Sequence, residues 1–200
     1  MNTSFSQHSE SGALFGLDAR IALAIFGVLS LVSGAALLAG LDSSRAKSLA
    51  TELSDLGKGI EALQYDLRDD IFTVATVPNG TEAFRTLFDK EAVAETGTWR
   101  GRWLGPYITF TGTQHPRYGA MSLEKHPAVH SQSCGGDDTC YQWVVYGNVK
   151  PSISAEVNTI IDGPHETTPE NQGRLQWDDG GDDTGILYYR AAKALTTEER

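Results

Sequence analysis

An uncharged apolar run occupies residues 21–41, close to the start of the chain. It reads IALAIFGVLSLVSGAALLAGL, and only two serines interrupt it. A helix of about 20 apolar residues is long enough to cross a hydrocarbon core of about 30 Å. The pattern therefore predicts a transmembrane helix over 21–41. A cleaved secretory signal is the alternative, but its apolar region would be too long and no basic cluster precedes it.

A second pattern follows directly and has helical periodicity. Apolar residues recur at spacings that alternate between four and three, and these residues are Leu49, Leu53, Leu56, Ile60, Leu63 and Leu67. Such a stripe predicts an amphipathic helix with one buried face. No proline lies between Ala19 and Asp70, so the simplest structure is one long helix over 17–70. Gly57 and Gly59 lower its stability by about 1 kcal/mol each and favour a kink.

Beyond residue 70 the chain alternates short strand-like and helix-like segments. Five runs rich in β-branched and aromatic residues are expected to be strands, namely 71–77, 107–112, 141–149, 173–178 and 185–192. Helices are expected at 81–95, with Thr81 as the N-cap, and at 152–163, with Gly163 at the end. The predicted fold class is α+β, a small antiparallel sheet in a globular head (71–200) that packs on the amphipathic half of the long helix. Four tryptophans are expected in the core of this head: Trp99, Trp103, Trp143 and Trp177.

Composition narrows the possible partners. The chain has 26 acidic and 16 basic residues in 200, and its formal net charge of -10 disfavours binding to nucleic acid. The two cysteines, Cys134 and Cys140, flank a glycine-rich segment that can bend back on itself. Their spacing predicts a small disulfide ring, which requires an oxidising compartment. Two unrelated free thiols are the alternative.

The layout of the whole chain resembles that of a known family. A short polar leader, a glycine, an acid at the start of an apolar helix and an amphipathic continuation are similar to the N-terminus of type IV pilins and type II secretion pseudopilins. The stretch WRGRWLGPYI (99–108) resembles a tryptophan and Gly-Pro-Tyr stretch of pilin-like proteins. Residues 153–177 resemble the helix, turn and strand near the end of some pilin-like subunits.

The resemblance implies processing and assembly of the N-terminus. A prepilin peptidase would cut the leader (1–16) after Gly12 or Gly16, and the new terminus would be methylated. Family members align subunits with an acid just past the cut. The acid here is Asp18, the sixth residue past Gly12 and the second past Gly16, and neither spacing is the usual one. Arg20 is expected to pair with Asp18 or to reach lipid headgroups; alternatively, both charges mark the end of a simple anchor.

Candidate metal ligands occur in two places. The segment WDDGGDDTG holds four acids, Asp178, Asp179, Asp182 and Asp183, in a glycine-rich loop of the kind that binds calcium. A solvated hairpin turn is the favoured interpretation of this loop, and a calcium site is the alternative. His126 and His130 are four residues apart, but Pro127 between them argues against a metal pair on a helix. We find no motif for a catalytic nucleophile or a phosphate-binding loop and expect no enzyme and no obligatory cofactor.

The sequence therefore predicts a structural, pilin-like subunit of a type IV pilus or secretion pseudopilus. Its expected partners are further copies or other pilin-like subunits, the prepilin peptidase and the inner membrane. The expected localisation is the bacterial inner membrane, as a single-pass protein with its head in the periplasm or in an extracellular filament. A monomeric membrane-anchored domain that binds a ligand or calcium is the alternative. A secreted domain released by signal peptidase is the third hypothesis.

Overall fold

A computed structural model describes residues 12–135, 138–164, 168, 170–181 and 184–195 of this chain. Within the first helix, the side chains of residues 12–15, 17, 35, 36, 38 and 39 lie outside the description. The chain divides into two units, residues 1–42 and 43–200, and each is described by itself. The predicted domain boundaries after residues 16 and 70 stay predictions.

The first unit consists of the helical residues of α1 (Gly12–Leu67) up to Asp42. Its large apolar side chains are exposed, as Leu23, Phe26 and Leu31 illustrate at 70%, 70% and 77%. That these residues and those from Ser43 onward act as one pilin-like helix stays a prediction.

The expected transmembrane span over 21–41, and with it the single-pass inner-membrane localisation, is wrong. Among the described residues, the structure contains no helix that is both long enough and apolar enough to cross a membrane.

The second unit is organised around residues 43–67 of α1. All six residues of the predicted apolar stripe, from Leu49 to Leu67, are at most 1% exposed and belong to one core cluster with the sheet. The helix passes through Gly57 and Gly59 without ending, and it stops where Arg68 adopts a left-handed backbone conformation with a φ of 55°. The stripe thus predicted the buried face of this part of the helix correctly.

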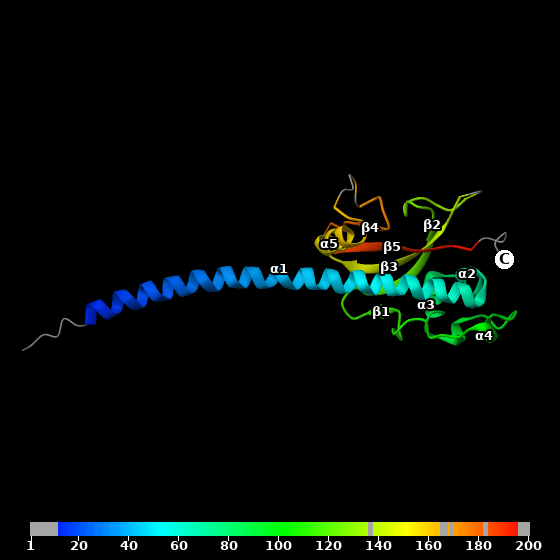
Figure 1. The fold of residues 1–200 in the computed structure, drawn as a ribbon, viewed down its shortest axis with the longest axis horizontal. Helices are drawn as coiled ribbons and strands as arrows, with labels where there is room; N and C mark the ends of the chain where they lie inside the picture. Colours follow the sequence, from blue (N-terminus) through cyan, green and yellow to red (C-terminus); the bar gives the residue numbers. More distant parts are fainter. Residues whose placement is uncertain (1–11, 136–137, 165–167, 169, 182–183, 196–200) are drawn as a thin grey trace, which may run out of the picture. The chain divides into compact units, whose positions relative to one another are not determined.

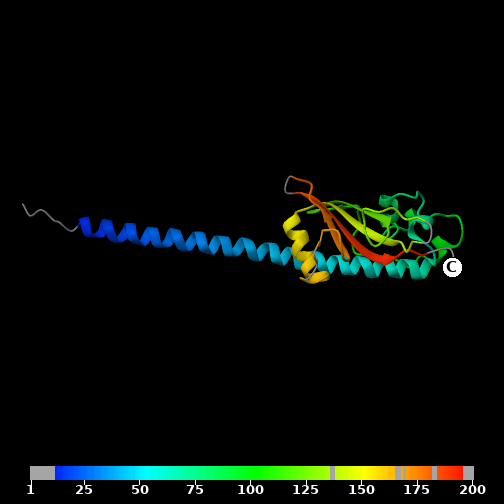
Figure 2. The ribbon, with the colours of Figure 1, turned by 90° about the horizontal axis from the view of Figure 1, so that it is seen from above.

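A five-stranded antiparallel sheet packs on this part of α1. Its strands lie in the order β1-β2-β3-β5-β4, and their bounds are β1 (Gln114–His115), β2 (Gly119–His126), β3 (Tyr141–Val149), β4 (Leu175–Asp178) and β5 (Gly185–Lys193). Figure 1 and Figure 2, a quarter turn apart, both show the strands beside residues 43–67 of α1. The strands predicted at 141–149, 173–178 and 185–192 are confirmed, and the pair β1–β2 was missed.

Two of the predicted strands are wrong. Residues 71–77 contain the short helix α2 (Ile71–Val74), because Asp70 caps it by accepting a hydrogen bond from the N–H of Phe72. This cap and the burial of Ile71 and Val74 outweigh the β-branched composition of the segment. Residues 107–112, all of them described, form no strand. Tyr107 instead donates its N–H to the carbonyl of Leu87.

The remaining helices are short. The segment predicted as helix at 81–95 forms α3 (Gly80–Arg85) and the 3-10 helix η1 (Lys90–Ala92), and the N-cap of α3 is Asn79 rather than Thr81. Helix α4 (Trp99–Arg102) follows. Helix α5 (Pro151–Ile161) confirms the helix predicted near the same position, and Gly163 with a φ of 93° follows its C-cap as expected.

Cysteines and tryptophans lie largely as predicted. Cys134 and Cys140 form the expected disulfide bond. Trp143 is fully buried, whereas Trp99, Trp103 and Trp177 are partly buried and pack against the core cluster. The α+β class and the antiparallel sheet are therefore established for the second unit.

Candidate functional site

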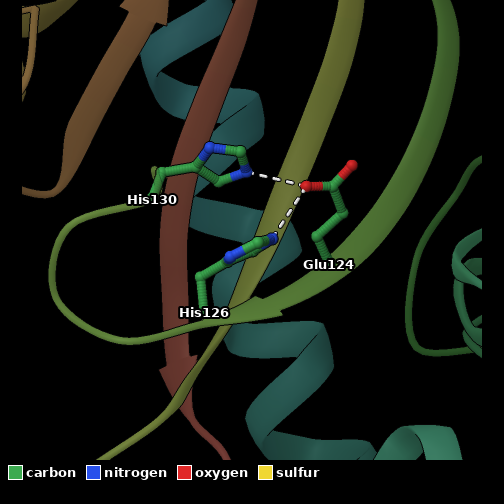
Figure 3. A group of neighbouring side chains, drawn as sticks. All are labelled: Glu124, His126 and His130. Carbon is green, nitrogen blue, oxygen red and sulfur yellow. Dashed lines mark hydrogen bonds and ion pairs between the residues drawn. The ribbon is translucent and has the colours of Figure 1, made fainter. Parts of the chain in front are cut away.

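Two histidines and a glutamate converge on the face of the sheet opposite α1. Glu124 and His126 lie two residues apart on β2, and side chains at this spacing share one face of a strand. The strand ends at His126, since Pro127 has no N–H to continue the ladder. The turn after Pro127 brings His130 back over the same face. Figure 3 shows both imidazole rings directed at one carboxylate oxygen of Glu124.

The three side chains are close enough to share one ion. Oε2 of Glu124 lies 2.7 Å from Nε2 of His130 and 3.1 Å from Nε2 of His126. One ligand atom from each residue lies within 4.8 Å of the other two. The side chains of His130 and His126 are 15% and 25% exposed, while that of Glu124 is 40% exposed. The histidines are thus held by the protein, and the carboxylate keeps freedom to adjust.

The electrostatics of the cluster favour an ionised carboxylate. The hydrogen bond with His130 lowers the pKa of Glu124, burial opposes this effect, and the charges of both histidines lower the pKa further. Burial raises the pKa of the neighbouring Tyr188 phenol, and the negative charges of Glu124 and Asp178 act in the same direction. Glu124 is therefore ionised at ordinary pH and faces both imidazole rings.

The turn that carries His130 is fixed from strands β3 and β4. The backbone N–H of His130 donates to Oε1 of the buried Gln176, whose Nε2 donates to the carbonyl of Ala128. Nε1 of Trp143 donates to the carbonyls of His126 and Pro127. The ring of His130 stacks on Tyr188 with centroids 3.6 Å apart and meets the edge of Trp143. This turn is preorganised without any ion.

Sequence reasoning considered the two histidines and set them aside. The argument that Pro127 excludes a metal pair on a helix holds, but the pair forms on a strand and the turn that follows it. Glu124 was missed altogether. The signal that could have found it is the alternation of residues 122–126, which places Glu124 and His126 on one face once the segment is recognised as a strand.

The acidic loop and the N-terminal residues lie elsewhere. Asp178 is exposed at the end of β4 and Asp179 directly after it, whereas Asp182 and Asp183 lie outside the described residues, so the calcium hypothesis stays a prediction. Gly12 is the first residue of α1, and Gly16 has open space around it. Asp18 and Arg20 are exposed on the same helix. The structure does not test the processing and assembly roles of these four residues.

The exposed apolar surface of α1 is the second feature with functional meaning. Ten large apolar side chains between residues 21 and 41 are at least 50% exposed: Ile21, Leu23, Ile25, Phe26, Val28, Leu29, Leu31, Val32, Leu37 and Leu41. At 3.6 residues per turn these positions occupy every side of the helix. We call them the apolar belt. Contiguous exposed apolar surface on a protein marks a place of contact with another molecule.

Searches for related proteins give no assignment of family. No family model, no curated protein and no solved structure matches this chain. The similarity to pilin-like proteins therefore rests on the residues of this sequence alone.

Proposed function

We propose that this chain is a structural, pilin-like subunit that assembles with copies of itself through the apolar belt. The observation that carries the proposal is the contrast between the two parts of α1. The stripe after residue 43 is buried by the chain's own sheet, whereas the side chains of the apolar belt are 50% to 77% exposed. Burial of apolar surface stabilises an assembly by about 25 cal/mol per Å2.

Copies of the same helix suit the apolar belt better than a single partner groove. A groove covers one face of a helix, but the belt is apolar on every side, so several neighbours are required to bury it. Gly27, Gly34 and Gly40 have no atom within 4 Å of the position a Cβ would take. Glycines at such positions allow the backbones of neighbouring helices to approach closely. The resemblance to pilins would make the assembly a filament with these helices at its centre.

Asp18 and Arg20 provide opposite charges at one end of the belt. A lone carboxylate in an apolar assembly is costly, and this cost falls when a cation of a neighbouring subunit pairs with it. A stagger between copies would place Asp18 of one subunit against Arg20 or the N-terminal amine of the next. In this proposal the pair sets the register of the subunits, and the belt supplies the affinity.

Removal of the leader is part of the proposal. Cleavage after Gly12 or Gly16 would make Asp18 the sixth or the second residue of the processed chain, close to the new amine. Intact mass and N-terminal sequencing of the protein from its own cells test this step. A chain that starts at Ala13 or Leu17 supports it, and a chain that starts at Met1 contradicts it.

Charge reversal tests the role of Asp18 in assembly. We expect Asp18→Arg to reduce the sedimenting, assembled fraction at least about tenfold, since like charges would then meet between copies. The double variant Asp18→Arg with Arg20→Asp restores opposite charges and is expected to regain assembly. Asp55→Arg is the matched control, because Asp55 is exposed on the second part of α1 and pairs only at the surface with Lys58. If Asp18→Arg assembles normally, Asp18 does not set the register of the subunits.

A further inference from the structure

We propose that Glu124, His126 and His130 form a binding site for a divalent transition metal ion, with Zn2+ as the expected occupant. Two imidazoles and one carboxylate are the donor set that zinc accepts in sites with three protein ligands and one open position. Hard cations such as Mg2+ and Ca2+ prefer sites made of oxygen atoms alone. The site is independent of the apolar belt and of the proposed assembly.

A backbone carbonyl fixes the tautomer of the neutral His126 ring. Nδ1 of His126 lies 2.7 Å from the carbonyl oxygen of Gln132, and a carbonyl only accepts hydrogen bonds. The hydrogen of the neutral ring is therefore on Nδ1, and Nε2 carries the lone pair. This lone pair faces Oε2 of Glu124 at 3.1 Å. A proton on Nε2 or a metal ion between the two atoms removes the repulsion between these two acceptors.

A second histidine–carboxylate pair in the same chain shows the opposite arrangement. Nδ1 of His115 accepts hydrogen bonds from the backbone N–H groups of Arg117 and Tyr118. Its hydrogen is therefore on Nε2, which faces Oε2 of Glu52 at 3.5 Å. That pair is satisfied by its own proton and offers no free nitrogen. His126 differs from His115 in this respect. The hydrogen bond at Nδ1 of His126 directs its Nε2 toward a carboxylate, and metal-binding histidines are oriented in the same way.

The distances need only small changes to admit zinc. Ligand atoms about 2.0–2.1 Å from a tetrahedral zinc ion lie about 3.3 Å from one another. The two separations to Glu124 are 3.1 and 2.7 Å. Glu124 is the most exposed of the three side chains, so it can withdraw by the required few tenths of an ångström. The ligand atoms of the two rings lie within 4.8 Å of each other.

The surroundings leave the site open to an ion. Lys125, the neighbour of Glu124 along β2, extends to Asp70 instead, with its Nζ 3.1 Å from Oδ2. His130 also lines a pocket of about 370 Å3 together with Tyr188 and Asp178. Because the Glu124 side chain is 40% exposed, a fourth position on the metal would be reached by water or by a small anionic ligand. Cys134 and Cys140 are bonded to each other and do not compete for zinc.

Zinc titration of the full-length chain tests the site. The protein is stripped with a chelator, and Zn2+ binding is measured by competition with a chromophoric chelator. We expect one equivalent to bind to the wild-type chain. Glu124→Gln, His126→Gln and His130→Gln are each expected to weaken binding at least about tenfold, since each removes a ligand. His115→Gln is the matched control and is expected to bind as the wild type does.

Cobalt binding separates ligation from damage to the fold. Co2+ in the wild-type site is expected to give the visible absorption of a four-coordinate ion, which Glu124→Gln should lose. Glu124 is the variant of choice because its exposed side chain supports little of the core, and circular dichroism without metal should match the wild type. The proposal is overturned if the wild-type chain binds no equivalent of zinc, or if the three variants bind it as tightly as His115→Gln does.

Discussion

Asp70 connects helices α1 and α2 to strands β2 and β3 through its buried side chain. Its side chain is almost fully buried, and three donors point at it. Oδ1 accepts the N–H of Phe72, while Oδ2 accepts from Nζ of Lys125 and from Nε2 of Gln142 at 3.1 and 3.0 Å. One carboxylate thus caps α2 and joins the end of α1 to β2 and β3.

Replacing Asp70 by alanine is expected to lower the free energy of unfolding by about 3–4 kcal/mol. The change removes the cap of α2 and leaves the buried amide of Gln142 without this acceptor. Urea unfolding followed by circular dichroism measures the loss. Asp55→Ala is the control, because the Asp55–Lys58 pair is exposed and such pairs contribute about 0–1 kcal/mol. Equal small losses in both variants would contradict this role of Asp70.

From the surroundings of Tyr107 we predict that the free energy of unfolding depends on pH in the alkaline range. Its hydroxyl donates to Oδ2 of Asp66 at 2.8 Å and accepts the N–H of Leu104. Burial raises the pKa of Tyr107 to about 12; the N–H of Leu104 opposes this rise, and Asp66 reinforces it. The folded chain therefore holds this proton where the unfolded chain releases it. The corresponding stability is present below pH 10 and is lost as the pH rises toward 12.

Phenylalanine at position 107 removes this titration. Tyr107→Phe is expected to be less stable than the wild type at pH 9, and the difference between the two proteins should shrink between pH 10 and 12. Urea unfolding at a series of pH values gives this difference directly. Since the other tyrosines are present in both chains, their titration cancels. A difference that stays constant over this interval would show that Tyr107 does not contribute in this way.

At the scale of the elements, Gly57 and Gly59 of α1 have different surroundings. A Cβ on Gly57 would meet Tyr189 and Ala191 at ordinary distances of 3.5–3.6 Å. A Cβ on Gly59 would lie 2.8 Å from Cγ2 of Ile108 and 2.9 Å from the carbonyl oxygen of Tyr107. The helix needs glycine at position 59 so that residues 107–108 can pack against it.

The two glycines give a paired test of this packing. Gly57→Ala is expected to raise the free energy of unfolding by about 0.5–1 kcal/mol, because alanine is the better helix former and space is available. Gly59→Ala is expected to lower it by about 1–3 kcal/mol through overpacking against Tyr107 and Ile108. Differential scanning calorimetry of the two variants beside the wild type distinguishes them. Stabilisation by both changes would mean that the 107–108 segment does not lie on the helix.

Elements with a repeated pattern could be predicted, and those set by single contacts could not. The stripe from Leu49 to Leu67 and the long apolar strand at 141–149 carry their signal over many residues. By contrast, 71–77 has the composition of a strand, and one side chain, Asp70, makes its first part a helix. Residues 107–112 lack a strand because Tyr107 bonds to Leu87 and Asp66 instead of to a neighbouring strand. No local sequence pattern indicates such contacts.

The candidate metal site could not be predicted from the sequence for the same reason. The sequence shows His126 and His130, but their meeting depends on a turn after Pro127 that is held by Gln176 from β4, far along the chain. The spacing alone pointed to a helix, which Pro127 forbids. Glu124 becomes visible only when β2 is recognised.

At the scale of the whole molecule, the two units differ in what covers their apolar residues. The second unit buries its stripe under its own sheet, while the first unit presents the apolar belt on every side. The single-pass inner-membrane placement expected from this run is contradicted among the described residues. Self-association is the function that we propose for the belt.

Thiol labelling at two matched positions of α1 tests this self-association most directly. Leu31 in the apolar belt and Tyr65 in the second part of the helix are 77% and 80% exposed. The native cysteines are bonded to each other, so Leu31→Cys and Tyr65→Cys each carry one free thiol. Labelling rates with a water-soluble reagent are measured over a range of protein concentrations, together with sedimentation. We predict that the rate at position 31 falls at least about tenfold as the chain assembles, because the belt becomes buried, while the rate at position 65 stays constant. Equal rates at both positions across all concentrations would contradict assembly through the apolar belt.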